Sequence, residues 1–134
     1  MGFIMTKSPL SVLFVDDEAV ILQAAETFFS SAGHKIITYS SPQALIDEQS
    51  SSGFAEFDCA VIDIEMPELS GTELYQKIAE KRDRLPVIFI SGYNFTEPLT
   101  MTTDTPYKFI PKPFQFSDLV KEVQIIAESG SEVS

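Results

Sequence analysis

The chain has 134 residues, of which 44% are hydrophobic and 22% charged. This balance is typical of one globular domain and excludes a disordered chain. A formal net charge of -11 argues against direct binding to nucleic acid or to an anionic membrane, because both carry charge of the same sign. No apolar run is long enough to span a membrane, residues 1–9 lack the pattern of a secretory signal, and a single cysteine excludes an internal disulfide, so we expect a cytoplasmic protein.

The first part of the chain alternates strand and helix patterns. Residues 11–15 are a continuous apolar run, typical of a strand buried on both faces. Apolar residues at helical spacing follow in 21–32, and Gly33 is placed to end that helix in a left-handed cap. A second strand is predicted over 35–40, and Ser41 before a proline has the N-cap pattern of a short helix.

The middle of the chain repeats this alternation. The apolar run 59–62 predicts a third strand, which ends at Asp63. After a turn that closes with Gly71, apolar residues at helical spacing predict a helix, and the run 87–90 predicts a fourth strand that ends at Ser91.

The last part of the chain contains one irregular segment. Residues 94–106 are rich in threonine and proline, so we expect any helix there to be short or poorly formed. A fifth strand is predicted over 107–110, and a final amphipathic helix begins near Ser117. We expect residues 1–9 to be a flexible N-terminus, 10–128 to form the domain, and 129–134 to be a flexible tail or the start of a linker.

Five strands that alternate with helices predict a doubly wound α/β fold, in which a parallel sheet is covered by helices on both faces. In such sheets the functional crevice lies at the carboxyl ends of the strands. Several residues whose side chains can bind a cation or take part in a reaction fall at or just past these predicted strand ends, namely Asp16, Asp17, Asp63, Ser91 and Lys112.

Three carboxylates in one crevice repel one another, so the pattern predicts a cation that neutralises them. Mg2+ suits a few carboxylates together with a phosphoryl oxygen, and a carboxylate can attack phosphorus to form an aspartyl phosphate. Taken singly, each residue has an ordinary explanation: Asp16 and Asp17 suit a helix N-terminus, and Asp63 suits a turn. The coincidence of all of them at strand ends favours the site.

The motifs that surround these residues resemble those of response-regulator receiver domains over about residues 11–128. The resemblance rests on order and spacing and on four segments: Val15-Asp16-Asp17-Glu18, Asp63-Ile64-Glu65-Met66-Pro67 with Gly71, Ser91-Gly92, and Lys112-Pro113-Phe114. It implies a strand order of 2-1-3-4-5 and a phosphorylation-dependent switch, whose only catalysis is phosphoryl transfer to itself and slow self-dephosphorylation.

The resemblance also implies a role for each site residue. Asp63 accepts a phosphoryl group from a histidine kinase or a histidine phosphotransfer protein. Asp17 binds Mg2+ directly, Asp16 binds it through water, and the main-chain carbonyl of Glu65 is a further ligand. Ser91 and Lys112 contact the phosphoryl oxygens.

The switch itself is also implied by the resemblance. Phe109 holds the position of a switch aromatic that turns from exposed to buried on phosphorylation, and the Lys112-Pro113 peptide bond is cis. The face formed by the 94–106 segment, the fifth strand and the last helix would contact an output partner or effector domain, which the sequence does not identify.

Two departures from the family pattern suggest individual behaviour. Gly92 replaces the usual alanine, and Thr105-Pro106 replaces a Gly-Ala pair, so we expect an unusual or more mobile output face. Glu65 and Tyr93 occupy the variable positions that flank the phosphorylation site, and we expect them to slow loss of the phosphoryl group to water.

Two other functions compete with this interpretation. Asp63-Ile64-Glu65 superficially resembles the nucleophile motif of haloacid-dehalogenase-like phosphohydrolases, although that reading leaves Asp16 and Asp17 without a role. A receiver-like binding module that is never phosphorylated is the third possibility.

Two further residues could in principle react or bind a metal. We expect Cys59 to be a buried, unreactive thiol and His34 to lie on the surface.

Overall fold

The structure, a computed structural model, describes residues 9–92 and 105–132. Its centre is a parallel five-stranded sheet with the order β2-β1-β3-β4-β5, which confirms the predicted doubly wound fold. The strands are β1 (Ser11–Val15), β2 (Lys35–Tyr39), β3 (Cys59–Asp63), β4 (Val87–Ser91) and β5 (Tyr107–Pro111).

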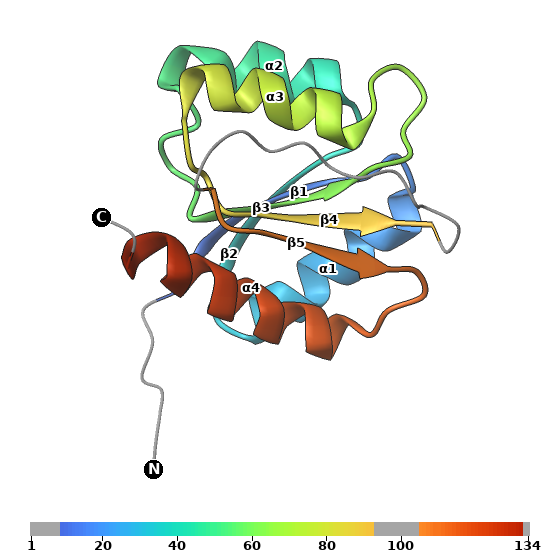
Figure 1. Cartoon of the computed structure of the whole chain (residues 1–134). Helices are drawn as coiled ribbons and strands as arrows, with labels where there is room; N and C mark the ends of the chain where they lie inside the picture. Colours follow the sequence, from blue (N-terminus) through green and yellow to red (C-terminus); the bar gives the residue numbers. More distant parts are fainter. Residues whose placement is uncertain (1–8, 93–104, 133–134) are drawn as a thin grey trace.

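Four α-helices cover the two faces of the sheet. Figure 1 shows α2 and α3 on one face and α1 and α4 on the other. The helices are α1 (Ala19–Ser31), α2 (Pro42–Gln49), α3 (Gly71–Lys81) and α4 (Phe116–Glu132), and a single 3-10 turn, η1 (Ser50–Ser52), follows α2. Each face has its own apolar cluster, so the sheet is buried on both sides.

Burial explains why the central strands are continuous apolar runs in the sequence. Every residue of β3 and β4 is buried, and so is β1 after its first residue, whereas the edge strands β2 and β5 are largely half-exposed or exposed. A strand with apolar neighbours on both faces has no solvent side, so its apolar run is continuous rather than alternating. The central strands therefore fix the positions of the residues that follow them.

Local signals set the helix ends that were predicted from the sequence. Ser41 caps α2, and its hydroxyl accepts a hydrogen bond from the Ala44 amide at 3.3 Å. Gly33 has a φ of +90°, the left-handed conformation expected after α1. At α3 a full capping box is present, in which Ser70 and Glu73 each accept a hydrogen bond from the other's backbone amide.

The prediction for His34 was wrong, because its side chain is only 8% exposed. Nδ1 accepts a hydrogen bond from the Leu10 amide at 3.0 Å, which requires a neutral ring, and Nε2 lies 3.0 Å from the side-chain amide nitrogen of Gln124. Burial lowers the pKa of His34, which favours this neutral form. The imidazole thus satisfies the backbone N–H of Leu10, just before β1.

The last helix is longer than predicted, since α4 continues to Glu132 and thus includes residues 129–132 that we expected in a flexible tail. Adding residues to an existing helix is favourable because each new residue gains a hydrogen bond without a new nucleus.

Two other predictions, the flexible 1–9 segment and the irregular 94–106 segment, lie almost wholly outside the described residues. Cys59 is fully buried as predicted, and burial raises the pKa of its thiol.

Candidate functional site

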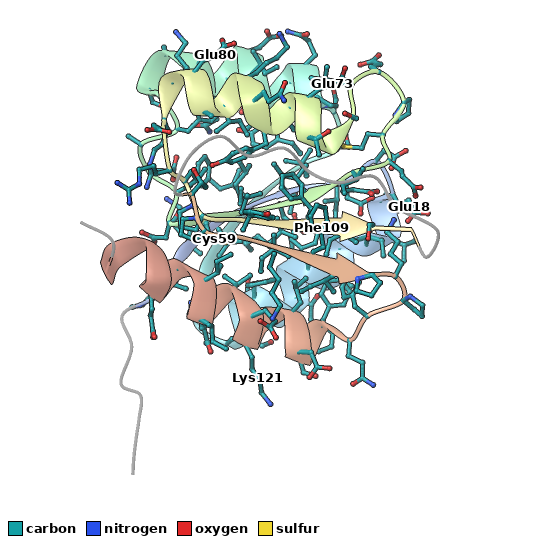
Figure 2. The ribbon with its side chains drawn as sticks, viewed as in Figure 1. Glu18, Cys59, Glu73, Glu80, Phe109 and Lys121 are labelled. Atoms are coloured by element: carbon teal, nitrogen blue, oxygen red, sulfur yellow. The ribbon has the colours of Figure 1, made fainter. Side chains whose placement is uncertain are left out.

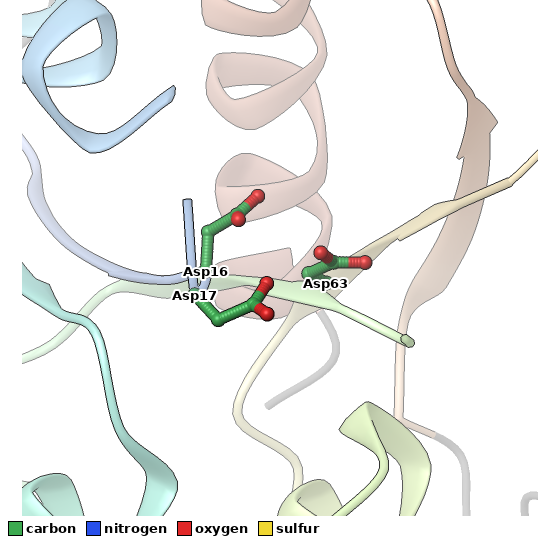
Figure 3. Close-up of side chains that lie close together, drawn as sticks. All are labelled: Asp16, Asp17 and Asp63. Carbon is green, nitrogen blue, oxygen red and sulfur yellow. The ribbon is translucent and has the colours of Figure 1, made fainter. Parts of the chain in front are cut away.

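Three aspartates meet at the carboxyl ends of adjacent strands (Figure 3). Asp16 and Asp17 directly follow β1, and Asp63 is the last residue of β3, which pairs with β1. One carboxylate oxygen from each residue lies within 4.8 Å of the others. Asp16 and Asp63 are buried, while Asp17 is exposed at the mouth of the site. The sheet topology therefore gathers the three acids that the sequence singled out.

The backbone fixes one oxygen of each buried carboxylate. Oδ1 of Asp16 accepts a hydrogen bond from the Glu18 amide at 2.8 Å, and Oδ1 of Asp63 accepts one from the Glu65 amide at 3.0 Å. Among the described residues, Oδ2 of Asp16 is buried without a hydrogen-bond partner. A buried carboxylate oxygen that lacks a donor is costly unless a cation or water satisfies it.

Burial makes the charged forms of Asp16 and Asp63 less favourable than they are in water. Burial raises the pKa of Asp16 from 3.8 to about 6, and the charge of Asp63 adds to this effect while the Glu18 amide and Lys112 oppose it. Burial likewise raises the pKa of Asp63, against the opposing effects of the Glu65 amide and Lys112. An all-oxygen donor set of this charge fits a hard divalent cation such as Mg2+.

Lys112 supplies the positive charge of the site from the loop after β5. Its Nζ lies 3.2 Å from Oδ2 of Asp63 and 3.8 Å from Oε1 of Glu18. Burial lowers the pKa of Lys112, but the hydrogen bond to Asp63 and the surrounding acids outweigh burial and raise it overall, so the ammonium group stays charged. The Lys112 amide donates to the Ser91 carbonyl at 2.8 Å, and the Lys112-Pro113 bond is cis as predicted.

The two switch candidates lie on adjacent strands. Ser91, at the end of β4, is 6% exposed. Phe109 of β5, labelled in Figure 2, is half-buried, and its ring stacks on Phe89 of β4 with the ring centroids 5.5 Å apart. Tyr93 lies outside the described residues. Sequence reasoning assigned no role to Glu18, although its position directly after the acid pair was a signal that it could reach the same crevice.

Gly71 allows α3 to begin directly against the end of β3. Its amide donates to the Ile64 carbonyl at 2.9 Å, and a Cβ at this position would lie 2.8 Å from Cα of Ile64 and 2.9 Å from the carbonyl carbon of Asp63. The Cβ would also meet the carbonyl oxygen of Asp63, and because all three neighbours are backbone atoms, none of them moves without displacing the main chain of Asp63 and Ile64.

We therefore expect Gly71→Ala to lower the free energy of unfolding by about 2–3 kcal/mol, measured by urea denaturation. Gly92→Ala is the matched control, since the nearest described atoms to a Cβ there belong to the flexible end of the Glu65 side chain, and we expect it to change stability by less than about 0.5 kcal/mol. Equal effects of the two substitutions contradict the close-packing argument.

Comparison with known proteins identifies the family of this site. The family model described as the response regulator receiver domain matches residues 12–124. The chain belongs to the response regulator receiver family. Response regulator receivers act in two-component signalling.

Individual relatives agree with this assignment. The response regulator protein TmoT of Ectopseudomonas mendocina is 29% identical over 114 residues, which are 84% of this chain and 50% of the relative. The receiver domain of the Francisella response regulator 1452 is 27% identical with a TM-score of 0.71, and the match covers 90% of this chain and 98% of that one. A receiver protein from Sinorhizobium medicae, 24% identical, has the same fold with a TM-score of 0.78, over 92% of this chain and 98% of that one.

This receiver spans about half the length of the curated relatives that it matches. None of the helices in the described ranges is both long and apolar enough to cross a membrane.

Proposed function

We propose that this receiver is a magnesium-dependent switch that accepts a phosphoryl group on Asp63 from a histidine kinase or a histidine phosphotransfer protein. The observation that carries the proposal is the position of Asp63, which is buried among two further aspartates and lies 3.2 Å from the Lys112 ammonium. In this reaction the P–N bond of a phosphohistidine breaks, a P–O bond to the Asp63 carboxylate forms, and the imidazole leaves.

The surrounding residues would each serve that transfer. Asp17 and Asp16 would hold Mg2+, directly and through water, with the main-chain carbonyl of Glu65 as a further ligand. Bound Mg2+ would neutralise charge on the carboxylates and on the phosphoryl oxygens. The Glu65 amide orients the Asp63 carboxylate, and Lys112 offers an ammonium group where negative charge accumulates.

The phosphoryl signal would be transmitted along β4 and β5. We infer that the Ser91 hydroxyl moves toward the new phosphoryl oxygens and that Phe109 becomes more buried in response. The half-buried position of Phe109 supports this role, because part of its side chain is still exposed and can be buried further. The partner that reads the change binds the face that includes β5 and α4, and the net charge of -11 favours a protein over nucleic acid or membrane.

The test is the intact mass of the protein after incubation with a small acyl phosphate, with and without Mg2+. We expect a magnesium-dependent gain of one phosphoryl group in the wild type and no gain in Asp63→Asn. Asp58→Asn is the matched control, since Asp58 is an exposed aspartate just before β3, and it should gain the group as the wild type does. No gain by folded wild-type protein overturns the proposal in favour of a binding module that is not phosphorylated.

A second assay separates the switch from a phosphohydrolase. A switch retains the phosphoryl group that it accepts, so p-nitrophenyl phosphate should not be turned over repeatedly. Multiple turnovers that disappear in Asp63→Asn support the phosphohydrolase instead.

Tyr93 and Glu65 would slow attack of water on the aspartyl phosphate, Tyr93 by screening the phosphoryl group from water and Glu65 by its negative charge.

A further inference from the structure

The side chain of Glu65 lies on the backbone of Gly92. The register of β3 and β4 pairs Asp63 with Ile90, so two residues beyond this pair Glu65 and Gly92 face each other across the strand ends. A Cβ at Gly92 would lie 2.7 Å from Oε1 of Glu65, 3.0 Å from Oε2 and 3.1 Å from Cδ. The carboxylate therefore occupies the space that an alanine methyl group would fill.

This contact joins the two loops that carry the phosphorylation site. The Glu65 amide donates to Asp63, and Gly92 directly follows Ser91, the hydroxyl expected to move. The side chain of Glu65 is exposed, unlike those of Asp16 and Asp63. It is thus a negative charge that remains at the mouth of the site and rests on the segment next to Ser91.

We propose that Glu65 and Gly92 form a latch that favours the unphosphorylated state. The inference rests on the proposed function. A phosphoryl group on Asp63 places additional negative charge beside Glu65, and like charges in a partly shielded site repel. The Glu65 carboxylate then leaves Gly92, and the end of β4 that carries Ser91 is released to move toward the phosphoryl group. Glu65 is a positioning residue in this scheme. Gly92 is required because any side chain at this position would fill the space that the Glu65 carboxylate occupies.

The latch differs from a carboxylate that happens to lie near a glycine. For a chance contact, Gly92→Ala pushes the flexible Glu65 side chain into solvent with no effect on phosphorylation. For a latch, the same substitution removes the carboxylate from the site and makes the phosphorylated state easier to reach. The effect of Gly92→Ala must then depend on the presence of the Glu65 side chain.

A double-mutant cycle tests this dependence, with the affinity for beryllofluoride in the presence of Mg2+ as the readout for a phosphoryl mimic. We expect Glu65→Gln and Gly92→Ala each to tighten binding roughly threefold to tenfold, as removal of one nearby like charge should. In the Glu65→Ala background, Gly92→Ala should change the affinity less than about twofold. Glu68→Gln, which alters another exposed acid of the same loop, is the control and should bind like the wild type.

Each outcome decides one question. If Gly92→Ala has the same effect with and without the Glu65 side chain, or if Glu65→Gln leaves the affinity unchanged, the latch is wrong while the switch stands. If the wild type binds no beryllofluoride and gains no phosphoryl group, the proposed function and the latch fail together.

Discussion

Lys112→Met is expected to slow magnesium-dependent phosphorylation of Asp63 by about two to three orders of magnitude, the usual effect of removing one preorganised group that stabilises developing negative charge. The Lys112 ammonium lies 3.2 Å from Oδ2 of Asp63 and stays charged because the surrounding acids raise its pKa. Methionine keeps the length and the apolar stem of the side chain but removes the charge. The measurement is the rate of phosphoryl gain by intact mass at saturating Mg2+.

Lys108→Met is the matched control for this prediction. Lys108 lies on β5, four residues before Lys112 in the sequence, but it is exposed and pairs with Glu122 of α4. Its removal should leave the rate within about twofold of the wild type, and an exposed ion pair contributes at most about 1 kcal/mol to stability. If Lys112→Met is phosphorylated as fast as Lys108→Met, Lys112 has no role in the transfer.

Asp16→Asn is expected to stabilise the metal-free protein at pH 7.5 by about 1–2 kcal/mol, although it removes a site residue. Burial raises the pKa of Asp16 from 3.8 to about 6, so the folded state prefers the protonated carboxyl. The stability that this preference provides is complete below pH 3.8 and is lost as the pH rises through 6. An asparagine resembles the protonated form at every pH, so the advantage of the variant should disappear as the pH falls toward 4.

The free energy of unfolding, measured by urea denaturation between pH 4.5 and 8, provides the test. Comparing the two proteins at each pH cancels the titrating groups that do not interact with Asp16, such as His34. Asp47→Asn, which alters an exposed acid on α2, should show no such pH dependence. Added Mg2+ should stabilise the wild type at pH 7.5 and stabilise Asp16→Asn much less. A variant less stable than the wild type at pH 7.5 without metal contradicts the prediction.

The sequence predicted the fold and the acidic cluster because both depend on short-range patterns. Asp16 and Asp63 each end an apolar run, and parallel strands bring their carboxyl ends to one edge of the sheet. The order of the strands and the role of each residue came from the family resemblance rather than from the pattern alone. The contact between Lys112 and Asp63 follows from the same topology, since both residues lie at strand ends.

Contacts between segments that are distant in the sequence were harder to predict from the sequence. His34 was expected at the surface because a lone histidine after a glycine gives no local sign of a partner, yet its partners Leu10 and Gln124 are 24 and 90 residues away. Predicting the contact between the Glu65 side chain and Gly92 also requires the register of β3 and β4, which no local pattern specifies. The end of α4 was misplaced because weak helix formers continue an existing helix more readily than they start one.

The direction of the strands has a consequence for how this domain combines with others. The start of β1 and the end of α4 lie at the amino ends of the strands, whereas Asp63 lies at the opposite edge of the sheet (Figure 1). A module joined by a linker to either of these ends is kept at a high local concentration without being tethered over Asp63, the proposed phosphorylation site. The same geometry leaves both ends suited to affinity tags or fluorescent reporters, because a phosphoryl donor for Asp63 would approach the domain from the other side.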